Sequence, residues 1–290
     1  MQVILSGARS LVGTLLINKL LKAGYRVFAL SRQSEFIRGQ TVQTGLSWHM
    51  WQDASFDPKL PEQIYQLIHV APLWVLPTLL EDLKSYGLTR VLGISSSSRF
   101  TKLTSPLPQE RDLAQKLITA EDESLDLCRQ HNIPWTIFYP TMIYGLNQDK
   151  NISSLSRFIK RYGFFPLAAE GKGLRQPVHA KDVAEACLLS LESENSYYKS
   201  YFISGAEVLS YREMIERIFL SLNKKPRIIN FPRSIMEFGL SLVKVLPNYR
   251  HINLAMLERI DQDLVFNHEN AQKDFGFKPQ AFSLNAEDLP

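Results

Sequence analysis

Short apolar runs alternate with longer segments of helical periodicity over the first half of the chain. The run QVILS at residues 2–6 has strand length, and after a Gly-containing turn the leucines recur at helical spacing until Gly24. Further strand-like runs lie at residues 26–30, 66–70, 90–95 and 135–138, and helical stretches lie at residues 76–86 and 112–130. This alternation predicts a Rossmann-type, doubly wound α/β fold with a parallel sheet covered by helices on both faces.

After Gly145 the pattern loosens into loops and helices. Helical spacing returns at 153–163 and 180–191, and residues 201–204 are a late strand of the main sheet. The remainder indicates a smaller, mostly helical C-terminal lobe. The predicted division is a Rossmann domain over 1–145, to which 175–205 return, and a second lobe over 146–174 and 206–290.

Composition and charge exclude several classes of protein. With 45% hydrophobic and 21% charged residues, the chain is an ordinary globular protein, and its net charge of +4 is dispersed, so no nucleic-acid partner is expected. Cys128 and Cys187 lack metal-ligand spacing, so neither a metal site nor a disulfide is expected.

We expect a cytoplasmic protein with no transmembrane segment, because the chain opens on a strand rather than a signal peptide. The longest apolar candidate, residues 234–246, contains Glu237 and Lys244 and is too short to cross a bilayer. This segment has two interpretations: it is an amphipathic helix of the second lobe, or it rests on a membrane surface.

The turn between the first strand and helix is the main candidate for chemistry. A Gly-rich turn lets backbone N–H groups and a helix N-terminus approach a pyrophosphate. Ser10 replaces the middle glycine of the usual pattern, where it either crowds the phosphate or donates a hydrogen bond to it. The predicted cofactor-binding residues of this turn are Gly7, Ala8, Arg9, Ser10, Leu11, Val12 and Gly13.

The end of the second strand distinguishes the two nicotinamide dinucleotides. An NAD site usually has a carboxylate there, which accepts a hydrogen bond from the ribose 2′-hydroxyl, whereas this chain has Arg32. A guanidinium suits a 2′-phosphate, and Arg9 could reach the same region. The sequence therefore favours NADP(H), with NAD(H) as the alternative cofactor. The other interpretation of Arg32 is an ordinary solvated charge on the surface.

Six segments in order resemble the extended short-chain dehydrogenase/reductase family, the NAD(P)-dependent epimerase/dehydratase group that acts mostly on nucleotide-sugars. They are ILSGARSLVG, LIHVAP, VLGISSSS, WTIFYPTMIYG, RQPVHAKDVAEA and YFISGAEVLSYREM. The resemblance implies that Ala71 and Pro72 lie beside the cofactor's ribose and pyrophosphate. It also implies that Pro140 and Thr141 flank the nicotinamide, and that the protein could form a homodimer.

The same resemblance implies that the Rossmann domain is dinucleotide-binding and that the smaller, mostly helical C-terminal lobe is a substrate-binding lobe. Ser97 matches the catalytic serine that hydrogen-bonds the reacting sugar oxygen, and Asn151 and Arg175 fall where the family holds a nucleotide-sugar's phosphates. His179 and Asp182 match a family stretch at a strand-to-helix junction, where a structural role is the main interpretation and catalysis the alternative.

The family's acid/base pair is missing from this chain. The family places a tyrosine four residues before a lysine, whose ammonium lowers the tyrosine pKa. Here no tyrosine occurs between Tyr86 and Tyr139, and alignment puts Gln115 and Thr119 near the expected positions. One hypothesis gives the proton-transfer role to another group near Ser97, with Lys102 the first candidate and Glu110 and Arg99 the others. The other is a catalytically inactive NADP(H)-binding redox sensor or scaffold.

Overall fold

The computed structural model describes residues 1–33, 37, 43–51, 65–168, 170–232 and 260–290. Its main sheet has seven strands: β1 (Gln2–Ser6), β2 (Arg26–Ser31), β3 (Leu46–Met50), β4 (Tyr65–His69), β5 (Leu88–Ile94), β6 (Trp135–Pro140) and β11 (Lys199–Ile203). Their order is β11-β6-β5-β4-β1-β2-β3, and every neighbouring pair is parallel. The predicted doubly wound α/β fold is confirmed, and β3 is the strand that the sequence patterns did not predict.

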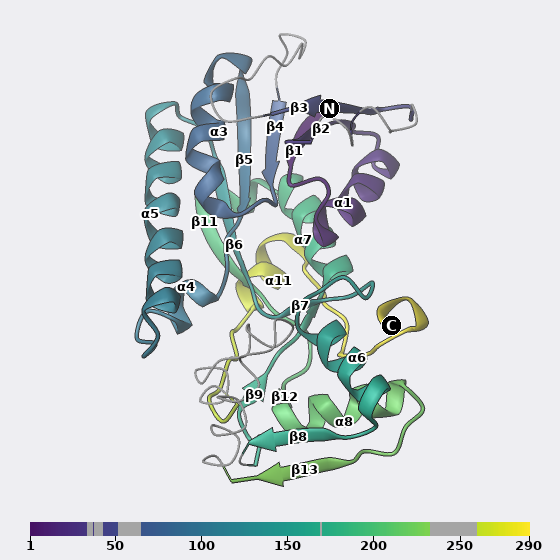
Figure 1. Ribbon diagram of the computed structural model, residues 1–290. Helices are drawn as coiled ribbons and strands as arrows, with labels where there is room; N and C mark the ends of the chain where they lie inside the picture. The colour runs from purple at the N-terminus through teal and green to yellow at the C-terminus, as the bar shows by residue number, and fades with distance from the viewer. Residues whose placement is uncertain (34–36, 38–42, 52–64, 169, 233–259) are drawn as a thin grey trace.

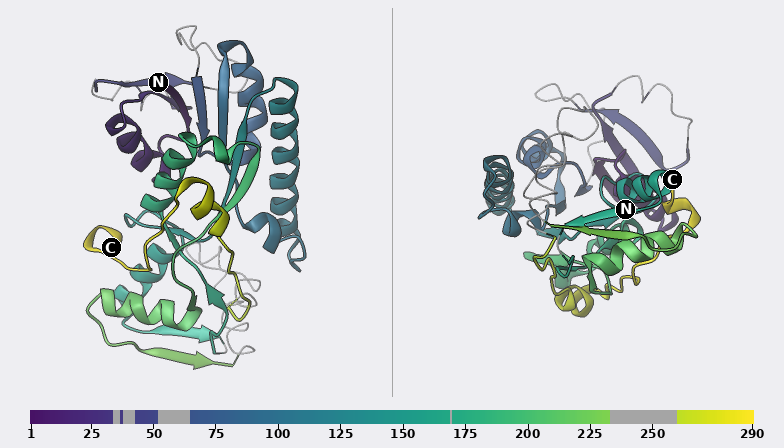
Figure 2. Two further views of the ribbon diagram at one scale, coloured as in Figure 1. Left: turned by 180° about the vertical axis from the view of Figure 1, so that it is seen from behind. Right: turned by 60° about the horizontal axis from the view of Figure 1, so that its bottom comes forward.

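Helices cover both faces of this sheet (Figures 1 and 2). The pairs are α1 (Leu11–Lys22) with α7 (Ala180–Leu191), and α3 (Leu76–Leu83) with α5 (Pro108–Gln130). Leu16 and Leu20 of α1 belong to one buried cluster and Leu79 and Leu117 of the second helix pair to another. Two separate apolar cores, one on each face, hold the strands in a fixed plane, so the ends of the strands form a rigid edge.

The second lobe lies below that edge in Figure 1. It contains α6 (Ile152–Tyr162), α8 (Tyr211–Ser221), the parallel pair β8 (Phe165–Ala168) and β13 (Ile228–Phe231), and the antiparallel pair β9 (Leu174–Arg175) and β12 (Leu209–Ser210). A third pair, β7 (Ile143–Tyr144) and β10 (Val178–His179), joins the lobes. The lobe is thus built from helices and short strands, which at two to four residues leave no readable period in the sequence.

One segment that was assigned to the second lobe packs on the main sheet instead. The helix α11 (Glu269–Phe275) packs against α7 and β11, and Ala271, Phe275 and Phe277 lie in the same buried cluster as α1. This part of 206–290 therefore covers the seven-stranded sheet rather than the second lobe. A helix of seven residues has too few turns for its apolar face to be read from the sequence.

Both cysteines are buried free thiols, Cys187 in the core beneath α1 and Cys128 in the core beneath α3. Over the described ranges, no helix is both long enough and apolar enough to cross a bilayer. The apolar segment at 234–246 lies outside the described residues.

Candidate functional site

A first cavity opens at the carboxyl ends of β1, β2 and β4. The order of the sheet reverses between β1 and β4, the position where ligands bind in open α/β sheets. Among the predicted cofactor residues, the cavity is lined by Gly7, Arg9, Ser10, Arg32, Ala71 and Pro72. The structure therefore gathers residues from three separate segments of the sequence around one space.

The two outer glycines of the turn are required by close packing of the backbone. Gly7 has a φ of +77°, and a Cβ there would lie 2.4 Å from the Ala71 nitrogen. A Cβ on Gly13 would lie 2.3 Å from the Gly7 carbonyl oxygen. Neither position accepts a side chain, so the turn presents bare backbone at the start of α1, as a dinucleotide diphosphate requires.

Four residues of the turn do not line the cavity: the buried Gly13, and three residues whose side chains pack inward. Ala8 and Val12 are buried, and the partly buried Leu11 packs against the same core. Their side chains therefore do not make the predicted cofactor contacts, because they pack into the core beneath α1. Any contact from them would come from the main chain.

Ser10, at the middle position of the pattern, caps α1. Its backbone is extended, and its Oγ accepts a hydrogen bond from the Gly13 N–H at 3.0 Å. The cap satisfies one of the N–H groups that a helix start leaves open. The Ser10 hydroxyl still has its proton to donate, which suits a phosphate oxygen.

Two substitutions of Ser10 separate capping from crowding. Ser10→Ala removes the acceptor and should destabilise the protein by about 1 kcal/mol, whereas Ser10→Gly should cost only a few tenths of that. Urea unfolding of the two variants beside the parent checks this order. Equal stabilities of the alanine and glycine variants would contradict the capping role.

Arginine side chains face the end of β2. Arg9 donates a hydrogen bond to Gln33 Oε1, and both line the cavity together with Arg32. Trp51, which the sequence patterns did not single out, also lines it, and its indole N–H donates to Asp82 Oδ2 at 2.8 Å. It follows the unpredicted strand β3, so no motif pointed to it.

His69 ends β4 just before the Ala71-Pro72 loop. It is fully buried, and burial lowers its pKa to about 4, against the weaker opposing effect of its hydrogen bond with the Pro72 carbonyl. Because a carbonyl only accepts, Nε2 carries the proton in this 3.2 Å contact. The imidazole is therefore neutral at physiological pH.

This neutral histidine predicts a loss of stability in acid. Its folded pKa lies below its unfolded value of 6.5, so the stabilisation is complete above that value and falls as pH drops toward 4. The loss attributable to His69 should reach about 3 kcal/mol between pH 7 and 4. Urea unfolding against pH should therefore be flatter for His69→Gln than for the parent, and parallel curves would contradict the prediction.

A second cavity lies at the ends of β5 and β6, facing the second lobe. It is lined by five of the predicted residues: Ser97, Lys102, Thr141, Asn151 and Arg175. They come from the loop after β5, the short helix α4 (Ser98–Thr101) and its end, the loop after β6, the start of α6, and β9. Pro140, the last residue of β6, is buried and does not line this cavity.

Main-chain contacts fix the two residues beside the sheet edge. The Ser97 N–H donates to the Pro140 carbonyl at 3.2 Å, and the Thr141 N–H donates to the Ile203 carbonyl at 3.0 Å. The Thr141 hydroxyl donates to the Gln176 carbonyl at 2.5 Å. Ser97 and Thr141 are therefore held by the rigid strand ends rather than by a free loop.

The opposite wall carries a positive charge. Arg175 is 4% exposed and donates to the carbonyls of Leu174 and Gln262, at 2.8 and 2.6 Å. Within the described residues no carboxylate lines this cavity, whereas Lys102 and Arg175 both do. The cavity therefore favours an anionic ligand.

Residues that the sequence did not single out complete this wall. Gln176 donates to the Gly205 carbonyl at 2.8 Å and accepts from the Phe266 N–H at 3.1 Å. Phe266 and Leu264 then line the cavity beside Met142. Segments this far apart in sequence are joined only by the fold, so no local spacing could have revealed them.

No tyrosine lines the second cavity among the described residues. Tyr139 is near in sequence, but burial, and then its hydrogen bond to Glu121, raise its pKa, so it stays a neutral phenol. Gln115 and Thr119 are exposed and hydrogen-bond each other at 3.5 Å, and Lys116 lies over the Trp74 ring. The expected equivalents of the family pair therefore do not point into the site, and Lys102 is the lysine that does.

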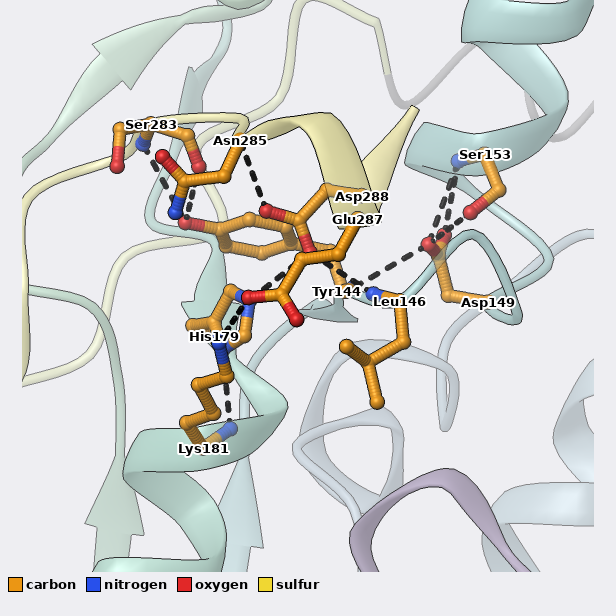
Figure 3. Close-up of polar contacts among 11 residues, drawn as sticks. Tyr144, Leu146, Asp149, Ser153, His179, Lys181, Ser283, Asn285, Glu287 and Asp288 are labelled. Atoms are coloured by element: carbon orange, nitrogen blue, oxygen red, sulfur yellow. Dashed lines mark hydrogen bonds and ion pairs between the residues drawn. The ribbon is translucent and has the colours of Figure 1, made fainter. Parts of the chain in front are cut away.

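His179 has a structural environment (Figure 3). It is buried, its Nδ1 accepts from the Lys181 N–H at 3.0 Å, and its Nε2 faces Asp288 Oδ1 at 3.2 Å. Asp288 also accepts from the Leu146 N–H at 2.8 Å. Asp182 accepts from the Gln280 N–H at 3.0 Å. These contacts fasten the last turn of the chain to the junction of the lobes and leave His179 outside both cavities.

Known proteins resemble this chain in sequence. The model of the NAD dependent epimerase/dehydratase family matches residues 75–203. The uncharacterized oxidoreductase YesF of Bacillus subtilis is 25% identical over 266 residues, which are 89% of this chain and 84% of that protein. A mitochondrial NADH dehydrogenase [ubiquinone] 1 alpha subcomplex subunit 9 of Arabidopsis thaliana is 29% identical over 147 residues, which are 48% of this chain and only 36% of that subunit.

Solved structures share the fold. A UDP-glucuronic acid 4-epimerase from Bacillus cereus, in complex with UDP-glucuronic acid and NAD, superposes with a TM-score of 0.72 at 14% identity, covering 97% of this chain and 95% of the epimerase. A UDP-glucose 4-epimerase from Thermotoga maritima, with UDP-glucose, gives 0.68 at 15% identity, covering 96% and 94%. The chain is therefore similar to the NAD dependent epimerase/dehydratase family over residues 75–203, and it has the fold of these solved epimerases.

Proposed function

We propose that this protein binds NADP(H) in the first cavity and a nucleotide-sugar or related sugar ligand in the second, where it transfers hydride at a sugar carbinol with a non-standard acid/base. The observation that carries the proposal is the second cavity: five residues predicted from separate segments, Ser97, Lys102, Thr141, Asn151 and Arg175, line it together. The guanidinium of Arg175 on its wall suits the phosphates of such a ligand.

The roles follow from chemistry and position. When bound, the nicotinamide supplies or accepts the hydride. Ser97, whose main chain is held by β6, would hydrogen-bond the reacting oxygen and orient it. Lys102 would donate its ammonium proton to that oxygen during reduction, and its neutral amine would take the proton back during oxidation. Asn151 and Arg175 would bind the anionic part of the ligand.

The preference for NADP(H) rests on the guanidinium groups at the end of β2. Arg9 and Arg32 line the first cavity, and no carboxylate among the described residues does. A ribose 2′-phosphate would meet positive charge there, whereas a 2′-hydroxyl would lack its usual acceptor. NAD(H) remains the cofactor to compare against.

Arg32→Ala should weaken NADPH binding about tenfold and leave NADH binding unchanged, since a charge-assisted contact contributes roughly 1.5 kcal/mol. Titration of the intrinsic tryptophan fluorescence reads this directly, because Trp51 lines the same cavity. Arg26→Ala, an exposed arginine at the opposite end of β2, is the matched control. Equal losses for both dinucleotides would contradict the assignment of Arg32.

The enzymatic proposal has one competitor, a redox sensor or scaffold that binds NADP(H) without turnover. The absent tyrosine and lysine pair favours it. A panel of UDP-glucose, UDP-glucuronic acid and other nucleotide-sugars, incubated with NADPH or NADP⁺, separates the two. Conversion of any of them that Ser97→Ala abolishes supports the enzyme, whereas binding of NADPH with no conversion supports the sensor.

Two expectations about the protein's surroundings belong to the same proposal. A homodimer, formed through the long helices beside the sheet as in other family members, would appear as a doubled mass by light scattering. A cytoplasmic location fits a cofactor of central metabolism and would appear by fractionation.

A further inference from the structure

A buried carboxylate at the start of α5 lies against the candidate acid/base. Glu110 is 7% exposed, and its Oε1 lies 3.6 Å from Lys102 Nζ. Its other oxygen, Oε2, accepts a hydrogen bond from the Ser105 hydroxyl at 2.7 Å. Glu110 is not on the cavity wall, whereas Lys102 is. The carboxylate therefore contacts the lysine without itself lining the cavity.

The other end of α4 is held from the same helix. Arg99 forms an ion pair with the buried Glu121, which also accepts from the Tyr139 hydroxyl at 2.5 Å. Glu110 and Glu121 are eleven residues apart, about three turns, so they lie on one face of α5. That face binds both cations of the segment 99–102 and fixes this segment against the sheet edge.

We propose that Glu110 is a positioning residue for Lys102: it holds the lysine ammonium at the wall of the second cavity, which Ser97 also lines. The proposal rests on the proposed function for its consequence in turnover. In most of the family the helix after the serine carries the acid/base itself. Here the helix α5 carries Glu110, and this carboxylate positions Lys102, which follows α4. Ser105 in turn fixes the rotamer of Glu110.

A purely structural role makes a different prediction. Glu110 lies in the first turn of α5, where any carboxylate stabilises the helix dipole. If this were its only role, Glu110→Gln would lower the stability of the protein whether or not Lys102 is present. The position and reactivity of the Lys102 side chain would stay unchanged. A measurement on Lys102 itself therefore distinguishes the two roles.

The first experiment needs no substrate. Brief treatment with acetic anhydride at one pH, followed by peptide mass spectrometry, measures how fast Lys102 is acetylated in the folded protein. Release from its buried partner should make Lys102 react about threefold faster or more in Glu110→Gln. Glu123→Gln, an exposed position on the same helix, should leave the rate unchanged. Equal rates in the parent and Glu110→Gln would overturn the proposal.

The second experiment uses whichever nucleotide-sugar is converted. Glu110→Gln should lower kcat about tenfold with KM nearly constant, because misplacing a catalytic group costs rate rather than binding. Glu110→Asp, which keeps the charge, should recover part of the loss, and in a Lys102→Met background Glu110→Gln should cause no further loss. An equal loss in both backgrounds would refute the positioning role. Faster acetylation without conversion of any sugar would retain Glu110 as the residue that holds Lys102 and reject the proposed function instead.

Discussion

Replacing Gly13 by alanine is expected to lower the affinity for NADPH by about 100-fold, the effect of roughly 3 kcal/mol of overpacking. The added Cβ would lie 2.3 Å from the Gly7 carbonyl oxygen and 2.9 Å from two backbone atoms of Ala8. No flexible side chain is available to move aside, so the turn itself must open. Calorimetric titration with NADPH measures the loss.

Gly24→Ala is the matched control, since it alters the other end of the same helix. Gly24 has a φ of +84° but no heavy atom within 4 Å of an added Cβ. It should lose about 1 kcal/mol of stability through backbone strain and bind NADPH like the parent. If Gly13→Ala bound NADPH normally while remaining folded, the turn could not be the diphosphate site.

The second large effect concerns Lys102. Lys102→Met keeps an unbranched side chain of similar length but removes the ammonium group that would donate the proton. The kcat should therefore fall by about 100-fold or more. NADPH binding should be unchanged, because Lys102 lines the second cavity and not the first. Steady-state kinetics with a converted nucleotide-sugar, together with the NADPH titration, tests both statements.

Lys116→Met is the control for this substitution, because Lys116 lies over the Trp74 ring and outside the second cavity. Its kcat should match that of the parent. A Lys102→Met enzyme with undiminished kcat would assign the proton transfer to another group.

The architecture could be predicted from the sequence wherever an element is long or strongly periodic. The strands β1, β2, β4, β5, β6 and β11 and the helices that cover them all have a continuous apolar pattern. The failures are short elements whose pattern spans only a few residues. β3 was missed, and α11 was assigned to the wrong lobe because its burial depends on contacts with α7 and β11.

Site residues could be predicted where a local motif carries the chemistry. Gly7 and Gly13 are marked by spacing alone, and their backbone contacts explain why no other residue fits. Trp51 and Phe266 line the cavities without any motif, because distant segments bring them there. Glu110 was a candidate acid/base by its closeness to Ser97, but which side of Lys102 it occupies depends on how α5 packs on α4.

The most direct test of the central claim is calorimetric titration of the unmodified protein with NADPH, NADP⁺, NADH and NAD⁺. The account predicts one binding site per chain, with NADPH and NADP⁺ bound more tightly than their counterparts. Absence of heat and of a thermal shift with all four would contradict it.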